Sequence, residues 1–591
     1  MRLKFCLLDA DRIEEAGKPL VRLWGVDESG KSVCVLTESE PYFYILPRGS
    51  AKKAEAEIKK ELEKKKQKII RIETVKRKLG REEKTFLKIF CCLPGDVPKV
   101  RELVKTLPQI EEQYEYSINF YRRFMIDNQF SGLQWLNIDG KEIKTSYAID
   151  VAIKAVKISS SDIEKTPKLK ILAFDIETFE EAGKSRLTMI SLASNNLNKV
   201  LTYRKTTFKD AEILSDEKQM LERFVEIVRE QNPDIILSYN GDAFDFELMQ
   251  KRALELKTRL ALGRDGSNVK FERRARTSSA HIAGRVHIDL YDFISNVLGA
   301  QLQTETLSLD AVSAELLGDK KIEMEFERIM EDWREKKDLA KLAEYCLKDS
   351  QLALRLGDYI LPQVFGLSKL VGQMPFDVSR MMYSQLVEWF LSRRAFALDT
   401  IIPNQPKFAE IELRRQKPRY IGGYVKEPIG GIHEGIAVLD FRSLYPSIIA
   451  SFNISPETLD CGKKEQGHKV PEMNHWFCKD EGFVSKAIRE LIERRIELKK
   501  KLKTIKDKKE WRRMKNEELS LKTVTNACYG YLAFPGSKWY CYECAESAAA
   551  FGRFFIKKII QEAEKEGFVV IYADTDSCFV KLKGNSQKYA K

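Results

Sequence analysis

Alternating apolar and polar positions divide the first 130 residues into short strands and one charged helix. Residues 51–68 carry Lys and Glu at i, i+4 spacing, which predicts a solvated helix. A polar segment at residues 159–168, with a proline near its end, predicts a linker into the next unit. Strand-like alternation runs through residues 3–8, 20–26, 42–46 and 85–90.

The next unit opens with residues 170–178, where apolar side chains alternate with acids. On a strand, Asp175 and Glu177 share one face and the apolar side chains share the other. Two adjacent carboxylates at the edge of a core strand form half of a metal site. A further acid, Asp245, follows the apolar run at residues 235–237 and a glycine turn.

Residues 338–356 predict a helix whose apolar stripe also carries Tyr345 and Asp349, one turn apart. Each acid taken alone is more simply a surface carboxylate. Together, four acids at strand and helix positions match a two-metal phosphodiesterase site, in which carboxylates hold two divalent cations and a tyrosine orients the attacking water. Asp289, on a predicted strand, is interpreted as structural.

Residues 438–449 predict a strand that ends in Asp440, a short turn and a helix N-terminus. The free N–H groups of the turn and the helix dipole favour a phosphate, and Asp440 can hold the cation that bridges its oxygens. Tyr445 projects from the turn and can pack under a sugar, where it blocks a 2′-hydroxyl. In isolation, a solvated acid in an ordinary strand-to-helix turn explains the pattern equally well.

Two helices between residues 484 and 529, joined by a charged segment at 503–516, combine apolar stripes with polar groups. A cationic, polar and aromatic series on one helix face suits a nucleotide, with cations on the triphosphate and the tyrosine against the base pair. The first helix contributes Arg495 and Lys499, one turn apart, and the second contributes Lys522, Asn526 and Tyr529 at i, i+4 and i+7.

The strand pair at residues 569–580 carries Asp574 and Asp576 at its turn. Two acids one residue apart repel each other, and a divalent cation would remove that penalty. Alone, an Asp-Thr-Asp turn is more often a solvated hairpin.

Composition places limits on the class of protein. The 591 residues exceed one hydrophobic core and correspond to about four domains. Lys and Arg exceed Asp and Glu by 101 − 88 = 13, which suggests a polyanionic partner. No apolar run approaches the roughly 18 residues of a membrane span, and acids follow the first apolar patch at once, unlike a signal peptide. We therefore expect an intracellular, cytoplasmic protein without a membrane partner.

Two close pairs stand apart among the 11 cysteines: Cys541 with Cys544, and Cys461 with Cys478. The first pair has the spacing of a zinc knuckle, but no second pair lies at zinc-ribbon distance. Spacing alone leaves free thiols, disulfides and zinc open.

The motifs, in their order, resemble those of family B DNA polymerases, in particular archaeal members. Phe-Asp-Ile-Glu-Thr, Asn-x-x-x-Phe-Asp and Tyr-x-x-x-Asp look like the three proofreading-exonuclease motifs. Tyr-Ile-Gly-Gly at 420–423 resembles the Tyr-Gly-Gly element, and the string from Asp440 resembles motif A. Lys-x-x-x-Asn-x-x-Tyr-Gly at 522–530 and Tyr-Ala-Asp-Thr-Asp-Ser at 572–577 resemble motifs B and C.

The resemblance implies a role for each matching residue. In the exonuclease, Tyr345 would position the water and the metal ligands would be Asp175, Glu177, Asp245 and Asp349. In the polymerase, Asp440 and Asp576 would hold metal, supported by Asp574. The nucleotide would contact Phe441, Arg442, Ser443, Leu444, Tyr445, Arg495, Lys499, Lys522, Asn526 and Tyr529. DNA would pass Tyr420, Gly422 and Gly423. By the same resemblance, both cysteine pairs would be disulfides.

The implied fold is multidomain, of the α/β and α+β classes. It comprises a mixed α/β N-terminal domain (1–130), an RNase H-like 3′–5′ exonuclease domain with a flanking linker (131–365), a palm with a mixed sheet (366–480 and 533–591) and helical fingers (481–532). The implied cofactor is Mg²⁺, two ions per active site, for which Mn²⁺ can substitute. The implied partners are primer–template DNA and deoxynucleoside triphosphates.

The sequence departs from the family after motif C, because it stops 15 residues beyond Asp576. Single-chain members continue into a helical thumb. We therefore expect the large subunit of a split polymerase, fully active only with a second, thumb-bearing subunit that also reaches a sliding clamp; a truncated chain would look the same. Pro41 and Val97 fall where relatives line a template-uracil pocket, but Arg12 replaces the aromatic residue common there.

Two other classes of function are compatible with parts of the sequence. The chain could act only as an exonuclease, or it could be a non-catalytic scaffold subunit. Intact motifs A, B and C argue against the first alternative. The retention of every acid argues against the second.

Overall fold

The computed structural model describes residues 1–181, 183–274, 277–319, 332–462 and 464–582. These residues form two compact units. The first unit comprises Met1–Pro41, Cys91–Asp96 and Ile118–Met382, and the second comprises Tyr42–Phe90, Val97–Ser117 and the chain from Tyr383 onward.

The first unit begins with a closed five-stranded barrel. Its strands, in spatial order, are β1 (Arg2–Glu15), β2 (Lys18–Asp27), β3 (Ser32–Glu38), β9 (Val151–Ser160) and β8 (Trp135–Glu142). The interior holds Phe5, Val21 and Leu136, and Phe124 of helix α3 (Phe120–Asp127) packs against them. The predicted boundary at residue 130 is therefore wrong for this unit, since β8 and β9 close the barrel. Closure satisfies the backbone edges of β1 and β3, which would otherwise stay unpaired.

A six-stranded mixed sheet follows the barrel. Its order is β13 (Ala211–Ile213), β12 (Leu197–Thr202), β11 (Lys184–Ser194), β10 (Ile171–Glu181), β14 (Ile235–Ser238) and β17 (Val286–Asp289). Strands β10, β14 and β17 are parallel, whereas β11 is antiparallel to both of its neighbours. The strand predicted at residues 170–178 is confirmed as β10.

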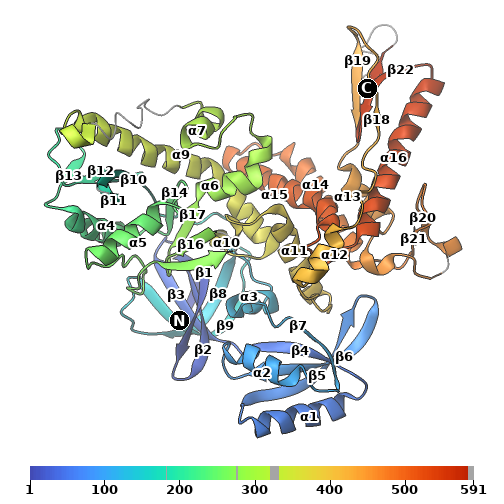
Figure 1. The fold of residues 1–591 in the computed structure, drawn as a ribbon, viewed down its shortest axis with the longest axis horizontal. Helices are drawn as coiled ribbons and strands as arrows, with labels where there is room; N and C mark the ends of the chain where they lie inside the picture. Colours follow the sequence, from blue (N-terminus) through green and yellow to red (C-terminus); the bar gives the residue numbers. More distant parts are fainter. Residues whose placement is uncertain (182, 275–276, 320–331, 463, 583–591) are drawn as a thin grey trace. The chain divides into compact units, whose positions relative to one another are not determined.

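Helices cover both faces of this sheet (Figure 1). On one face, Phe224 of α4 (Glu217–Gln231) and Phe246 of α5 (Asp245–Glu255) pack on Phe174. On the other face lies α9 (Leu339–Val371), whose Leu342 and Cys346 join one cluster with the sheet residue Met189. Because side chains alternate along a strand, the acids of β10 point away from Phe174 and toward α9.

The remaining elements of the first unit are short. They are the hairpin β15 (Lys270–Arg274) and β16 (Thr277–His281), helices α6 (Leu290–Phe293), α7 (Leu309–Leu317) and α10 (Pro375–Val378), a π-helical turn (Ile294–Leu298) and a 3₁₀ turn (Gly299–Gln301). Helix α10 ends at Val378, and α11 (Tyr383–Ala397) starts anew in the second unit.

The second unit contains a four-stranded antiparallel sheet near its start. The order is β5 (Ile69–Leu79), β6 (Glu82–Cys91), β4 (Tyr42–Pro47) and β7 (Ile110–Tyr114), with helices α1 (Ala51–Lys64) and α2 (Asp96–Val104) in the connections. Helix α1 buries only the stripe of Ala54, Ile58 and Leu62, which confirms the predicted solvated helix.

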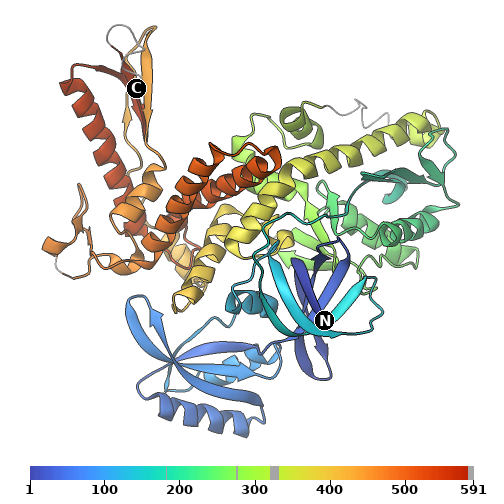
Figure 2. The ribbon, with the colours of Figure 1, turned by 180° about the vertical axis from the view of Figure 1, so that it is seen from behind.

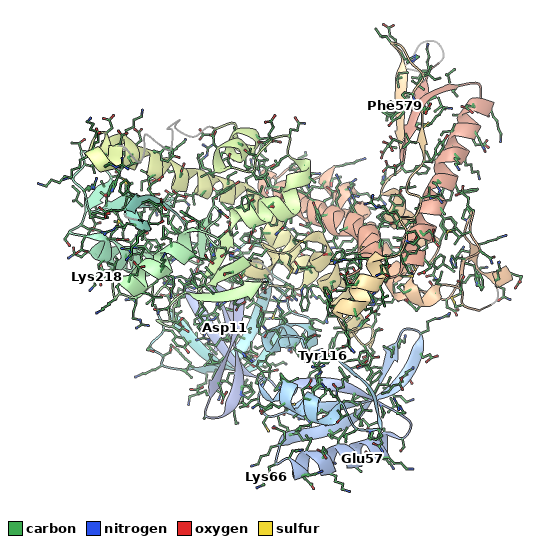
Figure 3. The ribbon with its side chains drawn as sticks, in the orientation of Figure 1. Asp11, Glu57, Lys66, Tyr116, Lys218 and Phe579 are labelled. Carbon is green, nitrogen blue, oxygen red and sulfur yellow. A yellow bond between two sulfur atoms is a disulfide. The ribbon has the colours of Figure 1, made fainter. Side chains whose placement is uncertain are left out.

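A second sheet in this unit has the antiparallel order β18 (Val425–Lys426), β22 (Val569–Asp574), β23 (Ser577–Lys581) and β19 (Ile436–Asp440). Helix α16 (Tyr542–Lys565) runs along this sheet, as Figures 1 and 2 show, and buries Ile556 and Ile560 against Val570 and Val580. In Figure 3, Phe579 marks β23; its ring centroid lies 5.6 Å from that of Tyr572 on β22.

Helices complete the second unit. Helices α13 (Leu444–Ser451), α14 (Phe483–Leu502) and α15 (Lys508–Ala533) pack on one another, and α15 also packs on α11. Thus the two helices predicted between residues 484 and 529 are confirmed, with a shorter connection than expected. The other elements are α12 (Phe408–Arg415), the strand pair β20 (His468–Lys469) and β21 (Trp476–Phe477), and 3₁₀ turns at Pro456–Thr458 and Lys464–Gln466.

The two cysteine pairs differ. Cys461 and Cys478 form a disulfide. Cys541 and Cys544 are buried free thiols, so the structure contradicts the second predicted disulfide. Instead, Cys541 caps α16, because its Sγ accepts the Cys544 backbone N–H at 3.4 Å. Among the described residues, neither cysteine belongs to a group of three potential metal ligands.

No helix within the described ranges is long and apolar enough to cross a membrane.

Candidate active sites

An acidic site lies between β10 and α9 in the first unit. Ligand atoms of Asp175, Glu177 and Cys346 all lie within 4.8 Å of one another. Ser191 of β11, which is opposite Asp175 in the sheet, donates from its Oγ to the carbonyl oxygen of Cys346 at 2.7 Å. This bond fixes α9 over the acids.

The other two predicted acids belong to the same site. Asp245, the first residue of α5, is 4% exposed and accepts a hydrogen bond from the backbone of Ile176, between the two acids of β10. Burial, followed by the charge of Asp289, raises the pKa of Asp245. Asp349 is equally buried, and its charge helps to raise the pKa of Cys346. Tyr345, one turn before Asp349 on α9, is 9% exposed.

These residues fit a divalent cation with oxygen ligands. Burial, together with the charges of Glu177 and Asp175, raises the pKa of Cys346 well above its usual value. Sulfur is also a soft ligand, which suits Mg²⁺ and Mn²⁺ poorly. The carboxylates Asp175 and Glu177 remain as hard ligands, of the kind that Mg²⁺ and Mn²⁺ prefer. A raised carboxyl pKa at Asp245 is also typical of acids that need a cation nearby.

Asp289 supports this site without belonging to the ligand set. Its carboxylate accepts the backbone N–H groups of Asn240, Asp242 and Tyr291, at 2.9, 2.9 and 3.0 Å. It therefore holds the turn that leads from β14 into α5 and positions Asp245. The structural interpretation of Asp289 agrees with these bonds.

Asp289→Asn is expected to lower 3′ degradation of DNA by about tenfold or more, because an amide nitrogen would face a backbone donor and shift the turn. Loss of one acceptor should also lower the free energy of unfolding by about 2 kcal/mol. Degradation of a 3′-labelled oligonucleotide and urea unfolding measure the two effects. Degradation within twofold of the unmodified chain would contradict the role.

Asp242 is a supporting residue that the sequence analysis missed. It accepts Arg380 Nε at 2.6 Å and the Ala280 backbone N–H at 2.8 Å. Burial opposes ionisation, but Arg380 and His287 keep the pKa of Asp242 well below its usual value. Its position in the same Asn-Gly-Asp turn as Asp245 was the available signal.

A second acidic site lies at one end of the β19–β23–β22 sheet in the second unit. Asp440 of β19 is opposite Ser577 of β23, and Asp574 of β22 is opposite the same serine from the other side. The Phe441 backbone N–H donates to the Asp576 carbonyl oxygen at 2.8 Å. Burial, then the charges of Asp440 and Asp574, raises the pKa of Asp576. The sheet register thus places Asp440 and Asp574 on the two strands that flank Ser577, at the same end of the sheet as Asp576.

Both turns at this site contain a non-glycine residue with left-handed backbone. Ser443 has φ 52° and Thr575 has φ 53°, a conformation that L-residues rarely adopt. The Ser443 Oγ accepts Arg495 Nη1 at 2.9 Å, and the Thr575 backbone N–H donates to the Tyr424 carbonyl oxygen at 2.9 Å. Tertiary hydrogen bonds therefore hold both turns.

The predicted nucleotide-contacting residues lie around these turns. Tyr445 and Tyr529 stack on each other, with ring centroids 4.1 Å apart and planes 10° apart. Lys522 and Asn526 are exposed on the same helix as Tyr529, and Arg442 is exposed beside the first turn. Phe441 is partly buried.

Three of the predicted residues have surroundings that the sequence did not indicate. The Leu444 side chain is 4% exposed, so Leu444 could reach a nucleotide only through its backbone. Arg495 and Lys499, the predicted phosphate ligands, both face Glu518 of α15: Arg495 at 2.8 Å and Lys499 at 3.8 Å. The sequence analysis did not predict this pairing, and phosphate binding by the two cations stays a prediction.

The Tyr-Ile-Gly-Gly segment contacts the acidic site directly. A Cβ on Gly423 would lie 2.5 Å from Thr575 Oγ1, so only glycine permits this approach. Arg553 Nη1 donates to the carbonyl oxygens of Ile421 and Gly422 at 2.5 and 3.0 Å. Tyr420 lies beside Tyr529. Burial, followed by a hydrogen bond with Tyr420, raises the pKa of Tyr529. Packing against the turn that carries Asp574 and Asp576, which the DNA-binding prediction did not foresee, explains Gly423.

Gly423→Ala is expected to lower primer extension by about 10- to 100-fold, because the new methyl group would displace the turn that carries Asp574 and Asp576. Gly422→Ala is the matched comparison, since a Cβ there has nothing within 4 Å and its effect should be much smaller. Single-turnover extension of a labelled primer measures both. Equal rates for the two variants would show that the contact with Thr575 does not matter.

Pro41 and Val97 are both buried, Pro41 in the first unit and Val97 in the second. Arg12 is exposed on β1. Uracil recognition stays a prediction.

Comparison with known proteins identifies the chain. The model of "DNA polymerase family B" matches residues 378–591, and that of "DNA polymerase family B, exonuclease domain" matches residues 111–312. A DNA polymerase of Pyrococcus glycovorans is 37% identical over 588 residues, which cover 98% of this chain and 71% of the relative. The chain belongs to the family B DNA polymerases.

Further relatives agree with this assignment. A DNA polymerase of Thermococcus gorgonarius is 36% identical over 593 residues, covering 99% of this chain and 72% of that one. The solved structure of the family B DNA polymerase from Pyrobaculum calidifontis matches with a TM-score of 0.84 at 28% identity. The match covers 99% of this polymerase and 75% of the Pyrobaculum chain. This family B polymerase therefore carries both DNA polymerase and 3′–5′ exonuclease domains. Asp175, Glu177 and Asp245 lie within the residues that the exonuclease-domain model matches.

Proposed function

We propose that the polymerase extends a primer at Asp440, Asp574 and Asp576 and removes mispaired 3′ ends at Asp175, Glu177, Asp245 and Asp349. The observation that carries the proposal is the register of the second sheet, which sets Asp440 and Asp574 on either side of Ser577. This register supports the proposal because it brings acids from separate strands to the same end of one sheet, and phosphoryl transfer needs carboxylates that can share cations.

At the polymerase site, the chain's residues bind and orient the two reactants. Asp440 and Asp576 would hold two Mg²⁺ ions, or Mn²⁺ in their place, and Asp574 would support them. When bound, such ions lower the pKa of the attacking hydroxyl or water and offset the charge of the leaving oxygen. Arg495, Lys499 and Lys522 would bind the triphosphate, and Tyr445 would lie under the sugar.

At the exonuclease site, the four carboxylates would hold the cations and Tyr345 would orient the attacking water. The buried position of Asp245 and Asp349, each 4% exposed, excludes bulk water from that side. In domain terms, we assign the exonuclease to the six-stranded sheet, the palm to the sheet of β18, β19, β22 and β23, and the fingers to α14 and α15.

The test is metal-dependent activity of the chain itself. Primer extension requires template, four deoxynucleoside triphosphates and Mg²⁺; degradation of the primer 3′ end is measured without nucleotides. We expect both activities to stop with EDTA and to return with Mg²⁺ or Mn²⁺. If the chain alone shows no extension and no degradation in any metal tested, the proposal for this chain alone is refuted. The predicted thumb-bearing subunit and clamp remain proposals, to be tested by an increase of extension when a candidate partner is added.

A further inference from the structure

Glu518 is a buried carboxylate that faces three cations. Its side chain is 2% exposed. Oε1 accepts a hydrogen bond from Arg495 Nε at 2.8 Å, and Oε2 accepts one from Lys515 Nζ at 2.8 Å. Lys499 Nζ lies 3.8 Å from Oε1. Burial tends to raise the pKa of Glu518, but the bonds from Lys515 and Arg495 outweigh it and lower the pKa, so the carboxylate is charged.

Arg495 links this carboxylate to the catalytic turn. Its side chain is 11% exposed, and its Nη1 donates to Ser443 Oγ at 2.9 Å. Ser443 lies three residues after Asp440. Glu518 on one side and Ser443 on the other therefore fix the plane of the guanidinium. Two of its five N–H groups make these bonds. The guanidinium can offer the others to a phosphate in the proposed function.

The charge of Glu518 also reduces the positive field at this place. A triphosphate carries several negative charges, and its attraction to a group of cations grows with their net charge. A buried carboxylate in contact with those cations reduces that attraction more than a solvated one, because little water screens it. A weaker hold on polyphosphate also favours release of pyrophosphate after each transfer.

We propose that Glu518 is a positioning residue that holds Arg495 beside the catalytic turn and, through its negative charge, limits the affinity of the fingers for polyphosphate. The inference rests on the proposed function, since it takes Arg495 and Lys499 as the triphosphate-binding cations. The Glu518 side chain then has two effects: its hydrogen bond orients Arg495, and its charge sets the affinity of the fingers for polyphosphate.

Glu518→Gln tests the charge, because an amide can still accept the Arg495 hydrogen bond. Calorimetric titration with inorganic tripolyphosphate and the KM for deoxynucleotides are the readouts. We expect about tenfold tighter tripolyphosphate binding and a lower KM, with kcat little changed. The matched control is Glu517→Gln, one residue away on α15, where the acid pairs with the exposed Arg494 and not with Arg495. This control should leave both quantities unchanged.

Glu518→Ala tests the positioning, because it removes the acceptor as well as the charge. We expect kcat to fall by about tenfold, a loss that Glu518→Gln does not share. The role of the charge would be overturned if Glu518→Gln bound tripolyphosphate with an affinity within twofold of that of the unmodified chain, or more weakly. An unchanged kcat in Glu518→Ala would overturn the positioning.

Arg495→Ala separates failure of this inference from failure of the proposed function. If the unmodified chain binds tripolyphosphate and Arg495→Ala binds it more weakly, the fingers assignment holds and the Glu518 variants alone decide the inference. If Arg495→Ala binds as tightly as the unmodified chain, or if the unmodified chain does not bind at all, the assignment of Arg495 and the inference are both overturned.

Discussion

Asp440→Asn is expected to lower primer extension by about three orders of magnitude, equivalent to ~4 kcal/mol of transition-state stabilisation, while 3′ degradation continues. The substitution keeps the size of the side chain and removes the charge that stands opposite Ser577, next to Asp576. Without that charge, a cation bound at this end of the sheet would have only the acids of the β22–β23 turn as carboxylate ligands. Single-turnover extension of a labelled primer in Mg²⁺ measures the loss.

The control for Asp440→Asn is Glu434→Gln, which removes an exposed acid in the loop before β19. It should extend the primer at the rate of the unmodified chain. The same protein preparation should degrade a 3′ end normally, which shows that Asp440→Asn has folded. Extension by Asp440→Asn within tenfold of the unmodified chain would contradict the placement of the polymerase site.

Asp175→Asn is expected to lower 3′ degradation by about three orders of magnitude and to leave extension unchanged. Asp175 and Glu177 share one face of β10, so losing either acid removes half of the pair that Cys346 cannot replace as a ligand. Release of labelled nucleotide from a single-stranded oligonucleotide, without triphosphates, measures the effect.

Glu180→Gln on the same strand is the matched control, because Glu180 is exposed. It should degrade DNA normally. The opposite selectivity of Asp175→Asn and Asp440→Asn is the sharpest expectation, since the acids lie in separate sheets. A variant that lost both activities together would show that the two sites are not independent.

The sequence predicts the local parts of each site well. Alternation along residues 170–178 places Asp175 and Glu177 on one face, and helical spacing places Tyr345 and Asp349 on the buried stripe of α9. The hairpin at 569–580 and the helices α14 and α15 follow from the same periodicities. Each of these features depends on residues within a few positions of one another.

Features that depend on distant partners were missed or wrong. The barrel needs β8 and β9 to close on β1 and β3, more than 100 residues earlier, as in the pairing of Val33 with Val151, so the domain boundary at 130 was misplaced. Cys541 caps a helix, although its spacing from Cys544 suits a disulfide or zinc. The sequence predicted Gly423 only as a residue that DNA would pass, whereas its close approach to Thr575 depends on tertiary packing.

Sequence alone therefore determined which side chains of this polymerase share a strand face or a helix stripe, because strand and helix periodicity is a local property of the backbone. The tertiary structure alone decided how those side chains are held and how strongly they are charged. Arg495 is one such case, since its spacing indicated a phosphate ligand and only the packing of α14 on α15 brings Glu518 to 2.8 Å from it. Burial and electrostatic contacts between residues far apart in the chain decide such pairings, and no short-range pattern records them.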